Sequence, residues 1–191
     1  ISIACEAYGT TGLQFDNPDT NATIHKFFEQ RLLKILKDAG IANDIIHSVM
    51  KVGYDDFYDV ILRAKALASY IDGNDKALIK ATLDNNGRAA NITETVTEVA
   101  IDTNLFTSDE ERTLYNALST CEEVIPGLVE NKDYLGVIKQ FETLNDAVEN
   151  FFEKILVMDE DTAVRQNRLS LVKHYNNLLG SYYKLDEVTF A

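Results

Sequence analysis

The sequence predicts an all-α fold, a helical bundle of about six to seven helices. Apolar residues recur at helical spacing in one segment after another from Ile24 to the end of the chain. These segments are divided by residues that stop or start helices, such as Gly40 and Ser108. No alternation of apolar and polar residues is long enough for a useful strand, so a sheet is not expected.

The chain divides into a short leading segment and one helical domain. Residues 1–22 show little periodicity and are rich in Gly, Thr, Asn and Asp, so we expect them to end a preceding region and to form a linker. Residues 23–191 are expected to form one helical domain, long enough to bury a core. Because the chain begins with Ile1 rather than Met, we expect it to be a piece of a longer protein.

The first two helices are predicted between residues 24 and 53. The first ends near Gly40, which suits a helix C-terminus. Its apolar side comprises Ile24, Phe27, Phe28, Leu32, Ile35 and Leu36. A short second helix is expected from Asp44 to about Lys51, before Gly53.

Two further helices are predicted from their apolar stripes. One opens with Asp55 and Asp56, whose charges suit the positive end of the helix dipole. Its stripe comprises Phe57, Val60, Ile61, Ala64, Leu67, Ala68 and Ile71. The other is expected from about Asn74 to Thr93, and Gly87 weakens it locally.

Three more helices are predicted after residue 107, and a capping box marks the start of the first of them. Ser108 and Glu111 have the spacing at which each side chain bonds the other residue's backbone, so a helix is expected from there to about Asn131, with a kink at Pro126. Residues 133–157 and 161–184 are each expected to form one long helix.

Several classes of site are not expected. The two cysteines, Cys5 and Cys121, have no CxxC spacing, so neither a disulfide framework nor a zinc site is expected, and a reducing compartment fits best. The three histidines are scattered, and no phosphate-binding glycine pattern, GxSxG or HExxH occurs. No apolar run approaches the ~20 residues of a spanning helix. We expect no catalytic site, no metal and no membrane contact.

The acidic charge is concentrated in one half of the chain. Residues 94–161 carry 17 Asp or Glu and four Lys or Arg, whereas the remainder is close to neutral within a total of −13. Phosphate binding relies on Lys and Arg, so this half is not expected to be the main RNA surface. In the first helix, Lys26, Lys34 and Lys37 cluster within about 80° on a helical wheel. This cluster is either a solvated helix back or a surface for an RNA backbone.

Arg168 falls near the centre of the apolar face of the last helix. A guanidinium that points into a bundle must be paired, because a lone buried charge is very costly. The acidic turn Asp159-Glu160-Asp161 supplies carboxylates, and Asp161 lies on the same side of the helix as Arg168. We therefore predict a structural ion pair of Arg168, with Asp161 or Glu160 as first candidates. The alternative is direct ligand contact, for which Arg165 and Asn167 are better placed.

Five segments, in order, carry a resemblance to a known family. They are FFEQRLLKIL, DVILRAKAL, GRAANI, LFTSDEERTLYNAL and AVENFFEKILVMDEDTAVRQNRLSLV. Together they resemble the C-terminal part of the bacterial glycyl-tRNA synthetase β subunit, from residue 24 to the end. The resemblance implies a DALR-type anticodon-binding domain, a helical bundle related to that of arginyl-tRNA synthetase.

The resemblance also implies a function. In such α2β2 enzymes the α subunit carries ATP-dependent glycine activation, with ATP and Mg, and the β subunit contributes tRNA recognition. This fragment would then bind no cofactor itself and would be a non-catalytic part of a cytoplasmic ligase. Its partners would be glycine tRNA and the α subunit. The alternative function is a helical protein–protein interaction module without RNA contact.

The candidate RNA-binding residues come from two sources. The polar motif positions that the resemblance singles out are Arg63, Arg88, Asn91, Arg165, Asn167 and Arg168, and all but Arg168, which is assigned to the ion pair, are candidates for RNA contact. The basic face of the first helix adds Lys26, Lys34 and Lys37. Sequence-specific RNA recognition usually targets unstacked loop bases, so a single-stranded anticodon is the expected ligand.

Overall fold

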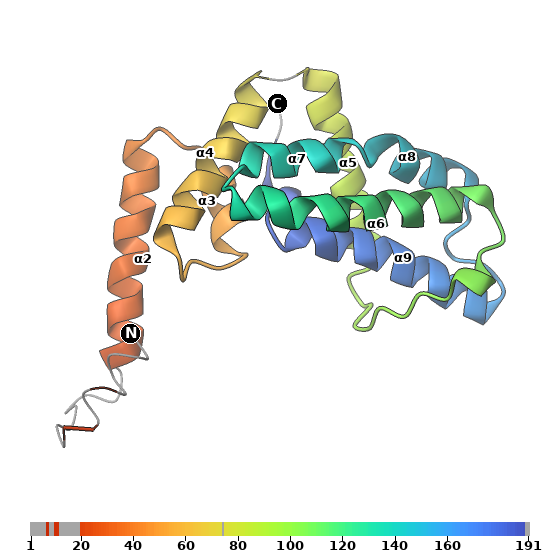
Figure 1. Cartoon of the computed structure of the whole chain (residues 1–191), viewed down its shortest axis with the longest axis horizontal. Helices are drawn as coiled ribbons and strands as arrows, with labels where there is room; N and C mark the ends of the chain where they lie inside the picture. Colours follow the sequence, from red (N-terminus) through yellow and green to blue (C-terminus); the bar gives the residue numbers. More distant parts are fainter. Residues whose placement is uncertain (1–6, 8–9, 12–19, 74, 190–191) are drawn as a thin grey trace. The chain divides into compact units, whose positions relative to one another are not determined.

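The computed structural model describes residues 7, 10–11, 20–73 and 75–189. These residues contain α-helices and short 3-10 helices and no strand (Figure 1). The predicted all-α class is therefore confirmed. The expectations for Cys5 and for most of the leading segment lie outside the described residues.

The chain forms two compact units, residues 1–40 and residues 41–191. The described helix of the first unit is α2 (Thr20–Asp38). Within it Leu32 and Leu36 are buried, whereas Phe27, Phe28 and Ile35 are 56%, 42% and 50% exposed. The apolar side expected for this helix is thus wider than the side that is buried. Leu32 and Leu36 are four residues apart, so they lie on the same face of the helix.

The second unit begins with three helices at the expected positions. They are α3 (Asn43–Met50), α4 (Phe57–Gly73) and α5 (Lys76–Ile92). α3 packs on α4, and Gly53 between them has φ +142°, a conformation that a residue with a side chain rarely adopts. Asp75 caps α5 by accepting from Ala77 N at 2.7 Å. The glycine permits the turn after α3, and the cap fixes where α5 begins.

α6 (Asp109–Glu130) lies in the middle of the second unit. Figure 1 shows α7 and α8 on one side of it and α9 on the other, and α6 contacts all three. The predicted capping box is present, because Ser108 Oγ accepts from Glu111 N and the Glu111 carboxylate accepts from Ser108 N. Pro126 lies inside the helix.

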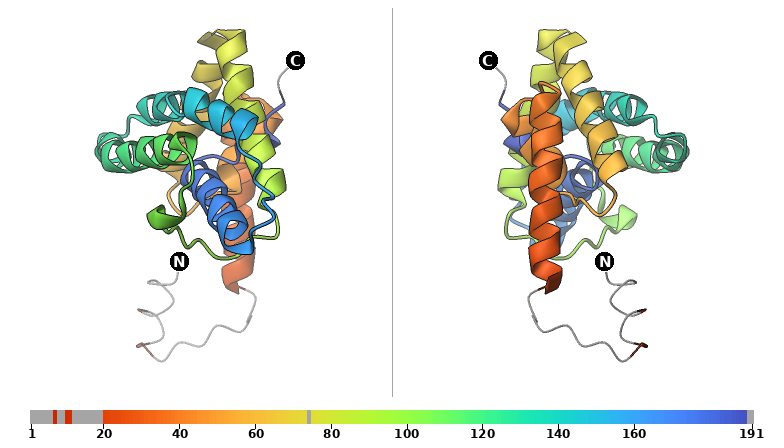
Figure 2. Two further views of the ribbon diagram at one scale, coloured as in Figure 1. Left: turned by 90° about the vertical axis from the view of Figure 1, so that its right-hand side faces the viewer. Right: turned by 90° about the vertical axis from the view of Figure 1, so that its left-hand side faces the viewer.

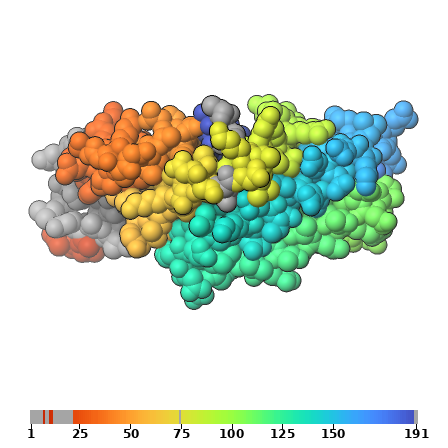
Figure 3. Space-filling model, turned by 90° about the horizontal axis from the view of Figure 1, so that it is seen from above, coloured from red at the N-terminus to blue at the C-terminus, as the bar shows by residue number. Residues whose placement is uncertain are grey.

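The single helix predicted over residues 133–157 is wrong, because the structure has α7 (Tyr134–Glu142) and α8 (Asn145–Lys154). At the break, Thr143 Oγ1 donates to the Gln140 carbonyl at 2.7 Å, and Leu144 N bonds Phe141 O at three-residue spacing. These tighter bonds end the α-helical ladder. α7 can then pack on α4 while α8 packs on α5, and both line α6, as Figure 3 shows in teal and blue beside green.

α9 (Thr162–Gly180) ends a turn earlier than predicted and packs on α5 and α6. Figure 2 shows α5 running across the direction of α9. After α9 the chain folds back against α3 and α5, where Lys184 N donates to Ser48 O at 3.1 Å. A short 3-10 helix, η2 (Leu185–Glu187), lies along α5. The end of the chain therefore covers part of α5.

The structure predicts opposite effects for two glycine substitutions. A Cβ at Gly136 would lie 2.5 Å from the carboxylate of Asp133, which caps α7 by accepting from Gly136 N. Gly136→Ala should therefore displace the cap and cost about 1 kcal/mol or more of unfolding free energy. Gly127→Ala in α6 meets no atom within 4 Å and should instead add ~0.5–1 kcal/mol. Urea unfolding of both variants tests this, and a stabilised Gly136→Ala chain would contradict it.

Candidate nucleic-acid interface

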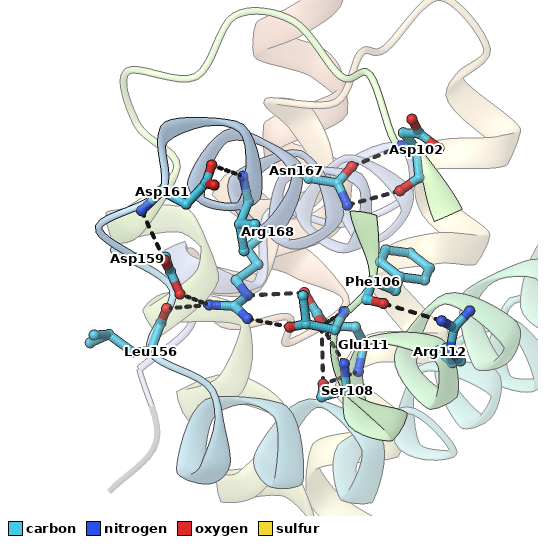
Figure 4. A network of polar contacts seen from close by, with 12 residues as sticks. Asp102, Phe106, Ser108, Glu111, Arg112, Leu156, Asp159, Asp161, Asn167 and Arg168 are labelled. Atoms are coloured by element: carbon cyan, nitrogen blue, oxygen red, sulfur yellow. Dashed lines mark hydrogen bonds and ion pairs between the residues drawn. The ribbon is translucent and has the colours of Figure 1, made fainter. Parts of the chain in front are cut away.

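Arg168 is buried and uses its whole guanidinium to join three segments (Figure 4). Its Nε donates to Glu111 Oε1 at 2.9 Å, at the start of α6. Its Nη1 donates to Asp159 Oδ2 at 2.6 Å and to Leu156 O at 3.0 Å, in the loop before α9. Its Nη2 donates to Thr107 Oγ1 at 2.9 Å. Arg168 therefore fastens α9 to α6 and to the loop between α8 and α9.

The partners of Arg168 differ from the expected ones. Asp161 caps α9 instead, and its carboxylate accepts from Ala163 N at 2.8 Å and Val164 N at 3.2 Å. Asp161 lies seven residues before Arg168, about 10 Å along the helix axis, and its carboxylate is committed to the first turn. The carboxylates that reach Arg168 are Glu111, recognised in the sequence only as part of a capping box, and Asp159.

Glu111 is fully buried and its carboxylate accepts several hydrogen bonds. Its Oε2 accepts from the backbone N–H groups of Thr107 at 2.8 Å and Ser108 at 2.9 Å, and from both of their hydroxyls. Burial raises the pKa of Glu111, but the hydrogen bonds from Arg168 and Thr107 and the charge of Arg168 outweigh it, so the pKa is lowered. Glu111 is thus held as a charged partner of Arg168.

Arg63, a predicted RNA contact, serves the fold. It is 6% exposed. Its Nε donates to Asp59 at 3.0 Å, and its remaining nitrogens donate to three backbone carbonyls, of Val49, Gly53 and Tyr182. Arg63 therefore ties α4 to the end of α3 and to the segment after α9, and all three nitrogens of its guanidinium donate within the protein.

Asn167, a second predicted RNA contact, is also committed. It is 3% exposed, its Oδ1 accepts from Asp102 N at 2.8 Å, and its Nδ2 donates to Asp102 O at 3.1 Å. Ser170 Oγ accepts from Ala100 N at 3.3 Å in the same way. α9 thus holds the extended segment before η1 (Thr103–Leu105), and neither end of the Asn167 amide is free to read a base.

Arg165 lies half-buried in the first turn of α9. Its Nη1 donates to Asp159 O at 2.8 Å, and its Nη2 donates to Thr162 Oγ1 at 3.2 Å. It therefore closes the acidic turn before α9, at the end of the unit where Arg168 lies. Arg165 therefore lies about 16 Å along the axis of α9 from the C-terminal part of that helix, where Asn176 is found.

Arg88 and Asn91 are brought together on the exposed side of α5. They line a groove of about 510 Å³ together with Lys80, Leu83, Asp84, Gly87, Leu185, Asp186 and Val188. The guanidinium of Arg88 stacks 4.3 Å from the ring centroid of Phe152, and its Nη2 donates to Phe152 O at 3.5 Å. The stacking fixes the plane of the guanidinium, and the residue remains exposed.

The lysines of the predicted basic face are exposed on α2. Lys34 pairs with Asp38 at 3.3 Å, an exposed pair of low energetic weight. Lys26 and Lys37 have no ion pair within the ranges that the structure describes. These three lysines belong to residues 1–40 and the α5 groove to residues 41–191, so the two candidate surfaces are described separately.

Sequence reasoning missed the remaining polar residues of the α5 groove. Lys80, Asp84, Arg88 and Asn91 follow each other at helical spacing, so their common side could be found from the sequence. The contribution of Asp186 could not, because it depends on how the chain returns after α9. Within the described ranges, no group of three or more His, Cys, Asp or Glu could hold a metal, and Cys121 is a buried free thiol. Nor does any described helix have the length and apolarity to cross a bilayer.

Comparisons with known proteins agree on one family. The family model of the DALR anticodon binding domain matches residues 82–187, which include most of the α5 groove, with Arg88 and Asn91, and all of α9. The chain is 33% identical over 150 residues to the glycine–tRNA ligase beta subunit of Desulforamulus reducens, covering 78% of this chain and 21% of the relative. It is 30% identical to the beta subunits of Clostridioides difficile and Magnetococcus marinus, over 87% and 97% of this chain. The chain spans about a fifth to a quarter of the length of these curated relatives.

Removing the buried arginine should destabilise the fold strongly. Arg168→Ala leaves Glu111 buried without its charged partner, and breaking a buried pair costs ~3–5 kcal/mol of unfolding free energy. Arg165→Ala, the same change three residues earlier at a half-buried position, should cost about 1 kcal/mol or less. Thermal unfolding of the two variants measures the difference. Equal melting temperatures for the two would show that Arg168 does not fasten the fold.

The same pair predicts a loss of stability in acid. The pKa of folded Glu111 lies below the ordinary value of 4.5, so the charged form stabilises the fold above that pH, and the contribution is lost as pH falls through the lower folded value. Glu111→Gln should be less stable at neutral pH and should lose less stability between about pH 5 and about pH 3. Urea unfolding across this range checks the slope, and identical slopes would contradict the assignment.

Proposed function

Because the chain belongs to the DALR anticodon-binding domain family, we propose that it recognises the anticodon loop of glycine tRNA. In this proposal it is the RNA-recognition module of a glycine–tRNA ligase β subunit, which is the name that its relatives carry. The observation that carries the proposal is the α5 groove, which the exposed side chains of Arg88, Asn91 and Lys80 line together.

The chemistry of the groove suits a single strand of RNA. The stacked guanidinium of Arg88 offers several N–H donors in a fixed plane, which match a phosphate or a base edge. Asn91 offers a donor and an acceptor on one amide, as base reading requires. Lys80, about 12 Å from Arg88 along α5, is placed to contact a neighbouring phosphate. Backbone contacts position the strand and base contacts give the specificity.

The charge of the chain supports an approach from the α5 side. Residues 94–161, which form α6, α7 and α8, carry the excess of carboxylates and repel phosphate. Of the residues expected to contact RNA, the proposal keeps Arg88 and Asn91, with Lys26, Lys34 and Lys37 of α2 as contacts to the RNA backbone. It leaves out those that the fold occupies, which are Arg63, Arg165 and Asn167.

We extend the proposal to the longer protein. It would join an α subunit in an α2β2 heterotetramer in the cytoplasm, and the α subunit would use ATP and Mg to activate glycine. This chain would then have no catalytic site of its own. Its part would be to bind a remote region of the tRNA, so that binding energy orients the acceptor end at the other subunit.

One observation favours the alternative, a protein–protein interaction module. In the loop between α8 and α9, Leu156 and Met158 are 70% and 58% exposed, beside the acidic residues 159–161. An exposed apolar pair with acidic neighbours suits a basic, partly apolar protein segment. This loop lies in the acidic half of the chain. A bound RNA should therefore protect the surface of α5, whereas a bound protein should protect this loop.

Footprinting and affinity on the intact enzyme test the proposal. Arg88→Ala with Asn91→Ala should weaken binding of glycine tRNA on the order of tenfold and narrow its preference over an anticodon mutant. Replacing Lys26, Lys34 and Lys37 by Ala should weaken both tRNAs alike and flatten the salt slope by up to ~0.7 per lost contact. Lys139→Ala, which removes an exposed lysine from α7, is the control and should change neither. If the groove variant binds like the wild type and RNA protects no part of α5, the chain is not the anticodon reader.

A further inference from the structure

A second cavity of about 280 Å³ adjoins the α5 groove within the second unit. It lies between α5, the C-terminal end of α9 and the segment that follows. Its polar lining includes Asn86, Asn176, Lys51 and Lys184. Asp186 lines both hollows, so the cavity and the groove are neighbours along one stretch of surface.

Asn86 gives this cavity a polar atom without a partner. The residue is 1% exposed, and its Oδ1 has no hydrogen-bond partner in the described part of the chain. Its Nδ2 donates to Asn176 Oδ1 at 3.4 Å, a long bond. Three other buried side-chain oxygens lack partners, on Ser48, Glu142 and Tyr175, but Asn86 is the one of the four that lines this cavity. A buried unpaired acceptor destabilises a fold, so its presence at a cavity points to a ligand that supplies the donor.

The rim of the cavity carries two lysines, Lys51 and Lys184, and two carboxylates, Asp186 and Glu187. A Cβ at Gly180 would lie 2.9 Å from Lys184 Nζ, so the glycine leaves room for this ammonium against the end of α9. Lys184 forms no ion pair within the residues that the structure describes, whereas Lys51 pairs with Glu187. The backbone N–H of Lys184 is bonded to Ser48 O, which fixes its position. The cavity therefore pairs a buried acceptor with an unpaired cation at its edge.

We propose that this cavity binds one unstacked nucleobase that bears an exocyclic amino group, as cytosine does. The amino N–H donates to Asn86 Oδ1, and a phosphate of the same strand lies at Lys184. Asn176 gives up its long bond and rotates to admit the base. The inference rests on the proposed function, because the strand is the one that occupies the α5 groove. Uracil presents a carbonyl oxygen where cytosine has its amino group, so it would face Asn86 Oδ1 with a second acceptor.

Asn86→Leu in the full-length protein with its partner subunit tests the inference. The probes are a glycine tRNA transcript, whose anticodon ends in two cytosines, and transcripts with each cytosine in turn replaced by uracil. The variant should bind the unchanged transcript on the order of tenfold more weakly. It should lose the preference for cytosine at one of the two positions, with little change for the corresponding uracil transcript. Asn85→Leu, whose side chain meets Asn145 of α8, is the matched control and should keep both affinities.

The outcomes separate the two proposals. If the wild type prefers cytosine and Asn86→Leu keeps the full preference at both positions, the cavity is not the base site and the proposed function stands. If the wild type does not distinguish the transcripts, the proposed function fails and this inference fails with it.

Hydrogen exchange of α5 in the intact enzyme reports whether the variant is folded. Leu has a similar size and removes an unpaired oxygen, so protection should be equal or greater. If protection is lost, Lys184→Met decides alone: it should weaken all the transcripts alike with a flatter salt slope, and unchanged affinity overturns the inference.

Discussion

The buried ion pair between Arg168 and Glu111 is the constraint on which the arrangement of the second unit depends. Both side chains are closed to water, at 7% and 0% exposure, so removing either one leaves the other buried without this charged partner. Because Glu111 is fixed by the amides that start α6, the pair sets where α9 lies against α6. The third partner, Asp159, fixes the loop that leads into α9. One guanidinium thus determines the relative position of two helices and their connection.

The position of α9 in turn determines what α5 presents to solvent. α9 packs on α5 along one side, and Lys173 Nζ donates to Thr93 O at 3.2 Å at the end of α5. The chain after α9 is tied back by Arg63, which bonds Tyr182 O, and by the bond from Lys184 N to Ser48 O. The network around Arg168 therefore holds α9 in place, and the network around Arg63 holds the segment after α9 in place; both of these segments pack against α5. The side of α5 that remains open carries Arg88 and Asn91.

The sequence predicted the parts of this structure that local chemistry decides. The helix positions and the capping box depend on residues a few positions apart, and both are present. The partner of Arg168 lies 57 positions away, and the break at Thr143 depends on α7 and α8 packing on different helices, so neither follows from local spacing. A motif match also cannot separate roles, since Arg63 and Arg88 stand in similar helical contexts. The number of carbonyl and carboxylate acceptors around each guanidinium separates them, and that number is a property of the fold.

The accounting of donors and acceptors also distinguishes fastening residues from binding residues. Arg63, Arg168 and Asn167 are buried, and every nitrogen of the two guanidiniums and both ends of the amide hydrogen-bond within the protein, which is the state expected of polar groups that hold a core together. Arg88 is exposed with donors to spare, and Asn86 is buried with an acceptor to spare. Of the four buried side-chain oxygens without a partner in the described part of the chain, Asn86 Oδ1 is the one that lines the cavity beside the α5 groove, so a ligand that donates to it is a better explanation than poor packing. On this argument the recognition chemistry lies where the internal network is incomplete, along α5 and the segment that returns over it.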